Sequence, residues 1–459
     1  MNTYRLERDI PVDEPYDVVI TGGGPAGTAA ALSSARAGAR TLLVEATGCL
    51  GGMGTSGLVT AFDPMADGKR MLVGGVMKEI VEKLYDRGEC GPQVTPDFYG
   101  KRYHCWTPFK AEGLKLLLDE LVTEAGVEVR FFTRVIDADA DADARRVNGV
   151  VLSNVEGYRF VPAKTFVDAT GDAVLCDLAG AACREAGRDT PRPMPATLTS
   201  LFAGIDWSAD VKSQQHAAIE RAIADGRFSQ PDHHLPGMSR VGETIGYLNG
   251  GHLFNLNALR CRDLSDGVML GRRLAVEYRE FYRTYVPGCE RIEHVTTAAV
   301  VGVRESRRIV GEYELTIDDY LARRKFPDQV GVYNKFVDVH PYDLSPEEFQ
   351  RFEKEHKETG RLGVGESFGI PYSILVPRGW QNLWAAGRCN SSDIKVHGSI
   401  RVMPAAGMMG QAAGTAAAQA VETGQAACAL DTRALVERLR AAGAYLPQDE
   451  LSSEMTRSS

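Results

Sequence analysis

A glycine-rich turn near the start of the chain is the part of the sequence that most directly indicates chemistry. Residues 17–27 read DVVITGGGPAG, so an apolar run passes straight into Gly22, Gly24 and Gly27 with the spacing G-x-G-x-x-G. Residues 28–39 are rich in alanine and have helical spacing. In a strand–turn–helix unit, such glycines allow a tight turn, close approach of the backbone to a pyrophosphate and close helix packing. The N–H groups at the helix start attract phosphate.

A second strand and further glycines follow this helix. Residues 40–44 form an apolar run that Glu45 closes. A carboxylate at this point can accept a hydrogen bond from a ribose hydroxyl. The segment 49–57, CLGGMGTSG, is dense in glycine, which indicates backbone packed against a flat or charged group. These patterns predict a dinucleotide-binding unit, and they do not separate NAD from FAD.

Elements later in the chain extend this unit. Two apolar runs end in glycine-containing turns, at 165–172 and at 383–388. Residues 147–154 and 158–161 have the composition of a β-meander. A glycine-studded helix is predicted over 407–422, and its start is a second point that favours negative charge. The fold class is therefore α/β.

Length and charge narrow the function classes. The chain has 459 residues, too many for one compact core. Its net charge of −9 argues against nucleic acid and anionic membrane surfaces as partners. No stretch approaches a membrane span, and the first residues do not read as a signal peptide. Nine scattered cysteines without a CxxC pair are typical of reduced thiols, so we expect a cytoplasmic protein.

The domains are predicted to be discontinuous. Residues 183–366 differ in texture from the flanking segments and read as an inserted α+β substrate or cap domain. Its two ends must lie close together, because the dinucleotide-binding pattern resumes afterwards. The expected division is a cofactor-binding domain of 1–60, 110–185 and 371–440, a substrate or cap domain of 61–109 and 186–370, and a disordered tail of 441–459.

Taken together, these segments resemble the FAD-dependent oxidoreductases of the glutathione-reductase-like superfamily, in the subfamily related to fumarate-reductase flavoproteins. The matching pieces are DVVITGGGPAG (17–27), Glu45, LGGMGTSG (50–57), VDATGDA (167–173), VRESRRIVGEY (303–313), AAGRC (385–389) and the segment 399–418. The resemblance implies a Rossmann-like FAD-binding domain, with a parallel sheet and a β-meander, and FAD as the cofactor.

The resemblance also implies which residues contact FAD. The glycine turn would hold the pyrophosphate, Glu45 the adenosine ribose, and the segment from Gly51 to Thr55 the centre of the flavin. A helix starting near Gly410 would direct its dipole at the pyrimidine edge of the flavin. The full set is Gly22, Gly24, Pro25, Ala26, Gly27, Glu45, Ala46, Gly51, Gly52, Thr55, Val135, Ala169, Gly171, Gly387, Arg388, Met403, Gly410, Gln411 and Ala412.

Three residues are candidates for catalysis. By the resemblance, His397 and Arg401 flank the flavin, although relatives carry a His–Glu pair in the loop that reads Asp393–His397 here. His397 is a candidate acid–base, with a purely structural histidine as the alternative. Arg401 is placed to bind a substrate carboxylate or the cofactor. His104 lies in an aromatic loop that is suited to covering a planar ligand or to loop packing.

Three other polar groups are more typical of structure than of a site. The arginines of 304–308 stand among Glu305 and Glu312, which favours a salt network over an anion grip. His233 and His234 lie in a loop without a spaced carboxylate. The acidic run 137–143 lacks the glycine and distal glutamate of a calcium loop. We therefore predict no metal site.

The leading interpretation is an enzyme that oxidises or reduces a small organic substrate by hydride transfer to or from flavin N5. One alternative is a flavin monooxygenase, which usually has a Gly-Asp pair where residues 386–388 read AGR. Another is a flavin-binding subunit of an electron-transfer or RNA-modifying assembly, which the acidic charge and the lack of cysteine clusters disfavour. The expected partners are a small-molecule substrate and, as an option, a second copy of the chain, with no nucleic acid and no membrane.

Overall fold

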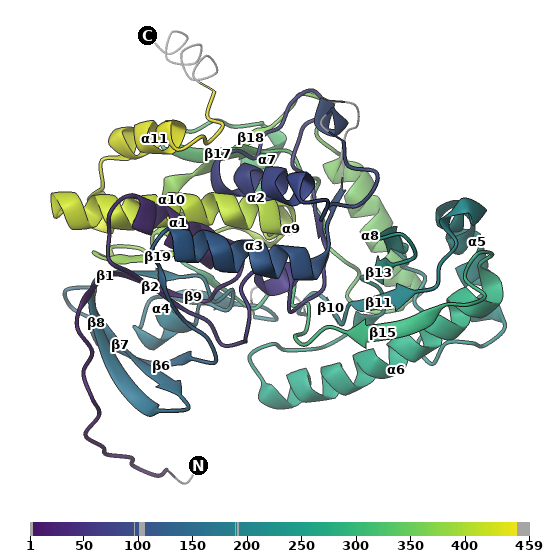
Figure 1. The fold of residues 1–459 in the computed structure, drawn as a ribbon, viewed down its shortest axis with the longest axis horizontal. Helices are drawn as coiled ribbons and strands as arrows, with labels where there is room; N and C mark the ends of the chain where they lie inside the picture. The colour runs from purple at the N-terminus through teal and green to yellow at the C-terminus, as the bar shows by residue number, and fades with distance from the viewer. Residues whose placement is uncertain (1–2, 96, 101–105, 189, 191, 448–459) are drawn as a thin grey trace.

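The central element of the described residues is a sheet of seven strands that joins a parallel half to an antiparallel meander (Figure 1). The computed structural model describes residues 3–447, except 96, 101–105, 189 and 191. The strand order is β5-β2-β1-β8-β7-β6, and β19 pairs with β8. These strands span Tyr16–Thr21 (β1), Thr41–Val44 (β2), Glu128–Arg130 (β5), Arg134–Asp141 (β6), Arg146–Asn154 (β7), Gly157–Asp168 (β8) and Leu383–Ala385 (β19). The α/β fold with a Rossmann-like sheet and a meander is confirmed.

Strand β8 belongs to both halves of the sheet. Its first part pairs antiparallel with β7 as far as Pro162, and from Ala163 it pairs parallel with β1. The sequence predicts two separate strands here, 158–161 and the start of 165–172, and this prediction is wrong. Proline has no N–H to donate to a ladder, and Pro162 lies where β8 changes partner. One strand can therefore run through it.

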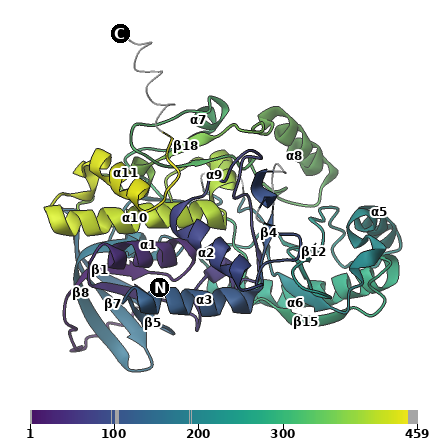
Figure 2. The same ribbon diagram turned by 45° about the horizontal axis from the view of Figure 1, so that its top comes forward.

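Helices α1 (Pro25–Arg36) and α10 (Met403–Thr423) lie side by side next to this sheet (Figure 2). Glycines bring their backbones into contact. A Cβ added at Gly410 would lie 2.0 Å from the carbonyl oxygen of Ala26, and one at Gly414 would lie 2.1 Å from that of Ala30. The first and last parts of the cofactor-binding half are thus joined without intervening side chains.

Two further segments share the core of this half. Helix α2 (Gly75–Asp86) packs its apolar face there with α3 (Ala111–Glu124). Parts of 315–376 pack in the same core. The sequence assigns α2 and much of 315–370 to the substrate domain, and the packing contradicts that part of the assignment. The rest of the division into domains stays a prediction.

A separate lobe lies away from β1 and β8 (Figure 1). It contains a sheet of order β12-β13-β11-β15, which is antiparallel throughout, and its helices close over a core of their own. Its elements are β10 (Ala196–Thr197), β11 (Ser200–Ala203), α5 (Val211–Ala224), β12 (Ser239–Arg240), β13 (Gly246–Leu248), β14 (His252–Leu253), α6 (Cys261–Tyr285) and β15 (Glu293–Thr297). This lobe is the inserted α+β unit.

The remaining elements are short or lie at the edges. They are β3 (Ala61–Phe62), β4 (Thr107–Pro108), α4 (Val174–Leu178), β9 (Cys183–Glu185), β16 (Arg307–Ile309), α7 (Ile317–Leu321), β17 (Gln329–Tyr333), α8 (Pro346–Thr359), β18 (Phe368–Pro371), α9 (Ile394–Ile400) and α11 (Thr432–Ala441). The predicted tail is wrong for 441–447, because Leu446 is buried and the carbonyl of Gly443 accepts from the N–H of Gly75 at 2.8 Å. Residues 448–459 lie outside the described residues.

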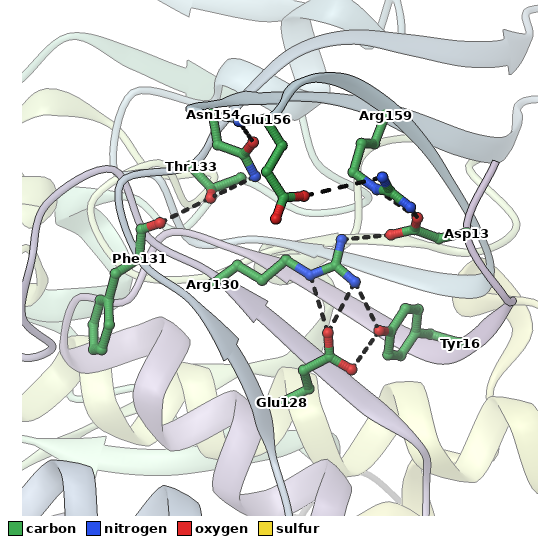
Figure 3. A network of polar contacts seen from close by, with 9 residues as sticks. All are labelled: Asp13, Tyr16, Glu128, Arg130, Phe131, Thr133, Asn154, Glu156 and Arg159. Carbon is green, nitrogen blue, oxygen red and sulfur yellow. Dashed lines mark hydrogen bonds and ion pairs between the residues drawn. The ribbon is translucent and has the colours of Figure 1, made fainter. Parts of the chain in front are cut away.

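A polar network ties the N-terminal segment to the sheet (Figure 3). Arg130 and Arg159 both pair with Asp13, and the nitrogens lie 2.5 Å from its carboxylate oxygens. The hydroxyl of Tyr16 donates to Glu128 at 2.5 Å. Burial acts to raise the pKa of Asp13, but hydrogen bonds from Arg159 and Arg130 outweigh it, so the pKa lies below its ordinary value. The carboxylate is thus held charged at neutral pH.

The two longest helices show different environments. Helix α10 is buried over most of its length and rich in Ala and Gly, whereas α6 buries one stripe and exposes charged residues. Among the residues that the structure describes, no helix combines the length and the apolar character needed to cross a bilayer.

Candidate functional site

The glycine turn after β1, residues 22–27, has the geometry of a phosphate-binding site. We call this turn, together with the loops that lie around it at 45–55, 169–172 and 387–388, the cradle. Gly22 adopts φ +95°, and a Cβ there would lie 2.5 Å from the carbonyl oxygen of Ala169. A Cβ at Gly27 would lie 1.7 Å from the carbonyl oxygen of Gly22. Helix α1 starts after Gly24 with Pro25 in its first turn and no side-chain cap. A Cβ at Gly24 would meet no heavy atom within 4 Å, so there is room beside the uncapped helix start.

Glu45 holds the loops of the cradle together. Its two carboxylate oxygens accept from the backbone N–H groups of Gly23 and Thr47, each at 2.7 Å. Its carbonyl accepts from the N–H of Thr133 at 2.9 Å, which places the start of β6, and Val135 two residues on, beside it. Each carboxylate oxygen keeps a further lone pair for a hydroxyl. Contact with a ribose remains a prediction for Glu45, for the exposed neighbour Ala46 and for Val135.

The glycine-dense segment lies against the turn, as its composition suggests. The N–H of Gly51 donates to the carbonyl of Gly23 at 2.8 Å, and a Cβ at Gly52 would lie 2.9 Å from the Cα of Gly24. Gly51 and Gly52 both have positive φ. The hydroxyl of Thr55 donates to the carbonyl of Leu50 at 2.5 Å, so it stabilises the loop itself.

Two further strand ends complete the cradle. Gly387 follows β19 with φ +88°, and a Cβ there would lie 3.1 Å from the Cβ of Ala26. Arg388 pairs with Asp172 at 2.7 Å and donates to Ser306 at 3.0 Å. Its guanidinium also lies beside Gly171, where an added Cβ would be 3.0 Å from it. Ala169, Gly171, Gly387 and Arg388 are therefore brought together around the start of α1.

The C-terminal helix begins earlier than the sequence suggests. The sequence predicts a start at 407, with the dipole acting near Gly410; the structure starts α10 at Met403, without a side-chain cap. Gly410 contacts α1, and Gln411 accepts from the N–H of Val76 at 3.1 Å. The uncapped end therefore lies at Met403, whose sulfur is 3.3 Å from a Cβ built on Gly54. The dipole argument applies to Met403 rather than to Gly410, Gln411 and Ala412.

These residues fit an extended dinucleotide cofactor. Two uncapped helix starts suit its anionic groups, glycines leave room for close approach of backbone, and Glu45 closes the far end. FAD would be held by the backbone around Gly24, by the segment from Gly51 to Thr55 and by the start of α10. When bound, it supplies a centre that accepts or donates a hydride.

His397 lies on α9, and Arg401 lies just after the end of this helix. The side chain of Asp393 caps α9 by accepting from the N–H of Val396. Arg401 donates to a carboxylate oxygen of Asp338 at 3.1 Å. Nε2 of His397 lies 3.1 Å from the carbonyl oxygen of Arg304. Because a carbonyl only accepts, Nε2 carries the proton and Nδ1 is left as an acceptor.

Burial lowers the pKa values of both side chains. It is the largest influence that lowers the pKa of His397, and Arg308 and Arg401 lower it further, so the imidazole is neutral near pH 7. Burial also lowers the pKa of Arg401, and Asp338 opposes that shift. Among the described residues, Nδ1 of His397 and Nε of Arg401 have no hydrogen-bond partner although both are buried. Buried polar atoms of this kind are uncommon and call for an explanation.

Further charges surround Arg401. Lys335 pairs with Asp63 at 2.7 Å and approaches Asp338 at 4.0 Å. Burial acts to raise the pKa of Asp338, but Lys335 and His340 outweigh it, so the pKa lies well below its usual value. Arg304, fully buried, donates to the carbonyl of Pro195 at 2.5 Å, and burial lowers its pKa to about 9.

The salt network predicted for the segment 304–308 has other partners for two of its residues. Arg307 pairs with Asp177 at 2.9 Å and approaches Glu185 at 3.9 Å. A carboxylate oxygen of Glu312 accepts from the N–H of Gly379 at 2.5 Å. Arg304 instead lies close enough to Arg401 and Asp338 for their charges to shift its own pKa, Arg401 downward and Asp338 upward. It belongs to the buried cluster, which the sequence does not indicate.

Three histidines lie next to this cluster. They come from the loop at His234, from β14 at His252 and from the loop at His340, and the rings of His252 and His340 have centroids 5.0 Å apart. Asp232 lies 2.8 Å from Nδ1 of His252. Burial lowers the pKa of His234 to about 4 and also lowers those of His252 and His340. The sequence shows no spacing that links these residues, although the pattern Asp338-x-His340 is a local sign of a polar site.

His104, the third catalytic candidate, lies outside the described residues. The structure brings the other two together and adds Asp338, Arg304 and Lys335, which sequence reasoning missed or treated as structural. We call the set Arg304, Lys335, Asp338, His397 and Arg401 the buried polar cluster.

The chain was compared with known protein families, curated proteins and solved structures. Residues 17–439 match the family described as FAD dependent oxidoreductase. A 47-residue stretch is 51% identical to dihydrolipoyl dehydrogenase from Trypanosoma brucei brucei, and the chain spans 10% of the length of that curated relative. A geranylgeranyl bacteriochlorophyll reductase-like protein from Thermoplasma acidophilum is 14% identical, with a TM-score of 0.46 over 94% of this chain and 83% of that one. A myxobacterial chondrochloren halogenase is 15% identical, with a TM-score of 0.43 over 94% of this chain and 79% of that one.

The family match covers all the segments that build the cradle, from β1 to α11. The fold, the uncapped helix starts and the glycine contacts are consistent with a dinucleotide cofactor. The chain therefore belongs to the FAD dependent oxidoreductase family.

Proposed function

We propose that this chain oxidises or reduces a small organic molecule by hydride transfer to or from N5 of FAD. We also propose that it belongs to the branch of glutathione-reductase-like flavoproteins that is related to fumarate-reductase flavoproteins. The sequence segments at 50–57, 167–173, 303–313 and 399–418 support the second statement.

The observation that carries the proposal is a pair of buried atoms without partners. Nε of Arg401 is a donor and Nδ1 of His397 is an acceptor, and neither is satisfied among the described residues. They follow one another closely on α9 and just before the uncapped start of α10. A substrate that brings both an acceptor oxygen and a donor hydroxyl or amine would satisfy both.

The roles of the residues follow from these atoms. Arg401, held by Asp338, would fix a substrate oxygen through a charge-assisted hydrogen bond. His397, neutral and held by the carbonyl of Arg304, would accept a hydrogen bond or a proton at Nδ1. Arg304, Lys335 and His397 are buried, and the lower dielectric around them strengthens these interactions. Arg304 adds positive potential, so a substrate with an anionic group is favoured.

The test is anaerobic reduction of the FAD-loaded protein by a panel of small 2-hydroxy, 2-amino and saturated carboxylic acids. At least one should bleach the flavin absorbance, or its oxidised counterpart should reoxidise the reduced protein. If no member of such a panel reacts in either direction, the proposal fails. Rapid reduction by NADPH with oxygen uptake only when substrate is present would instead indicate a monooxygenase.

A further inference from the structure

Three histidines from distant segments converge beside the buried polar cluster. One ring nitrogen from each of His234, His252 and His340 lies within 4.8 Å of the other two. Nε2 of His252 and Nδ1 of His340 are 2.9 Å apart. His252 and His340 are buried, and His234 is partly buried. The sequence separates His252 from His340 by 88 positions, so their meeting is a product of the fold alone.

The outer nitrogens of two of these rings face carboxylates. Asp232 lies 2.8 Å from Nδ1 of His252, and Asp338 lies 3.5 Å from Nε2 of His340. Asp232 also accepts from the N–H of His234 at 3.0 Å. A metal-binding histidine almost always donates its other ring N–H to a carboxylate or a carbonyl, which fixes the tautomer and the ring orientation. Here the two carboxylates lie beside the outer nitrogens, at 2.8 and 3.5 Å, but Nδ1 of His252 has no hydrogen-bond partner among the described residues.

The hydrogen-bond roles conflict when no cation lies between the rings. If Nδ1 of His252, which has no hydrogen-bond partner in the part of the chain that the structure describes, carries its proton toward Asp232, Nε2 of His252 is an acceptor, so His340 must donate from Nδ1. A neutral His340 then turns its bare Nε2 toward Asp338, which only accepts. A metal ion bound by Nε2 of His252 and Nδ1 of His340 removes the conflict, because each outer nitrogen then carries a proton toward its carboxylate.

The spacing suits a first-row transition metal. Imidazole nitrogens bound at about 2.0–2.1 Å to one tetrahedral ion lie roughly 3.3–3.4 Å apart. The observed 2.9 Å and the limit of 4.8 Å bracket that value, so small side-chain movements would form the site. Arg304 opposes a cation here, and the carboxylates of Asp232 and Asp338 offset its charge. Three nitrogen ligands leave a coordination position open.

We propose that His234, His252 and His340 form a binding site for a divalent first-row transition-metal ion such as zinc, with Asp232 and Asp338 orienting the rings. The site does not depend on the redox reaction proposed above. From the sequence we expected no metal site, because these histidines and carboxylates do not occur at the short spacings of a known ligand set. The proposed site therefore differs from that expectation.

The test is equilibrium dialysis of the full FAD-loaded chain, stripped with chelator, against Zn²⁺, with metal measured by mass spectrometry. The wild-type chain should hold one equivalent. His252→Ala and His340→Gln should lose that equivalent, and Asp232→Asn should weaken affinity by about 10- to 100-fold. His233→Ala is the matched control, because His233 is the exposed neighbour that pairs with Glu220 at 2.9 Å.

Each outcome decides the question. Zinc held by the exposed thiols of Cys261 and Cys428 would remain bound to His252→Ala. The difference in zinc content between the wild-type chain and His252→Ala therefore measures the histidine site alone. A wild-type chain without a stoichiometric equivalent overturns the site even if every variant misfolds. Equal loss in His233→Ala overturns it too. FAD content, read from flavin absorbance, should be unchanged in Asp232→Asn, so failure of the metal site is distinguishable from failure of the flavin assignment.

Discussion

The cofactor cradle and the buried polar cluster are built in opposite ways. The cradle is made of backbone: Gly22, Gly27 and Gly387 are there because a Cβ would collide with a neighbouring segment. The cluster is made of side chains, and Arg401, Asp338 and Arg304 reach it from three separate segments. A site made of backbone requires glycines at fixed spacing, which can be recognised in the sequence. A site made of side chains from distant segments can be recognised only once the fold is known. The comparison explains why the cofactor can be read from the sequence and the chemistry of the substrate cannot.

The largest expected effect comes from breaking the cradle. Gly27→Ala places a Cβ 1.7 Å from the carbonyl oxygen of Gly22. Since the backbone cannot move aside easily, we expect destabilisation of about 3 kcal/mol and a chain that purifies without colour. Gly24→Ala is the matched control, because its φ of −68° suits alanine and the space around it is open. Thermal unfolding separates the two: Gly24→Ala should keep the wild-type melting temperature of the cofactor-free chain. Equal melting of both variants would contradict the packing argument.

A large but purely functional effect should come from the cluster. Arg401→Ala should lower kcat/KM by about 2–4 kcal/mol of transition-state stabilisation, roughly 30- to 1,000-fold, while FAD binding stays normal. Arg401→Lys should recover only part, since a single ammonium does not reproduce the planar guanidinium. The control is Lys395→Ala on the same helix, which should leave turnover unchanged. Wild-type turnover in Arg401→Ala would move the substrate site elsewhere.

A side chain inside the cradle sharpens the comparison. Glu45→Gln keeps one acceptor but turns an amide NH₂ toward a backbone N–H, so one of its two 2.7 Å bonds is lost. A hydrogen bond to a charged group contributes about 1.5–3 kcal/mol. We expect FAD affinity to fall by roughly 10- to 100-fold, measured by fluorescence titration of the cofactor-free chain. An unchanged affinity would show that the glycines alone hold the cofactor.

The smallest expected effect lies outside both the cradle and the buried polar cluster. It shows how much an ordinary ion pair contributes to the stability of this chain. Asp13→Asn removes the carboxylate that Arg130 and Arg159 share, and we expect a loss of about 1 kcal/mol in the free energy of unfolding near pH 7. The folded pKa of Asp13 lies below its ordinary value of 3.8. Its contribution is therefore complete above that value and is lost as pH falls through the lower, folded value. Urea unfolding of both chains at about pH 7 and about pH 3.5 should show the gap narrowing in acid. A constant gap would contradict the charged pairing.

Where sequence reasoning erred, the cause was local. The sequence predicts two strands, 158–161 and the start of 165–172, where the structure has β8 alone, because the change of partner within β8 cannot be seen without the neighbouring strands. The start of α10 was placed too late although Pro404, which suits a first turn, marks it. The sequence assigns Gly410 to the cofactor, since it does not show that α1 passes directly beside that glycine. His252 has no local signal, and the only local sign at His340 is the nearby Asp338, because the residues that meet there come from distant segments.

The contact of Gly410 and Gly414 with α1 also sets an order of events during synthesis. Helix α1 leaves the ribosome early, but its partner lies near the other end of the chain. If both helix starts contact the flavin as predicted, the complete binding surface exists only after α10 has been made and has docked. We therefore expect the flavin to bind late in the synthesis of the chain. A truncated or stalled product would carry the complete glycine motif and still lack half of the surface that the motif serves.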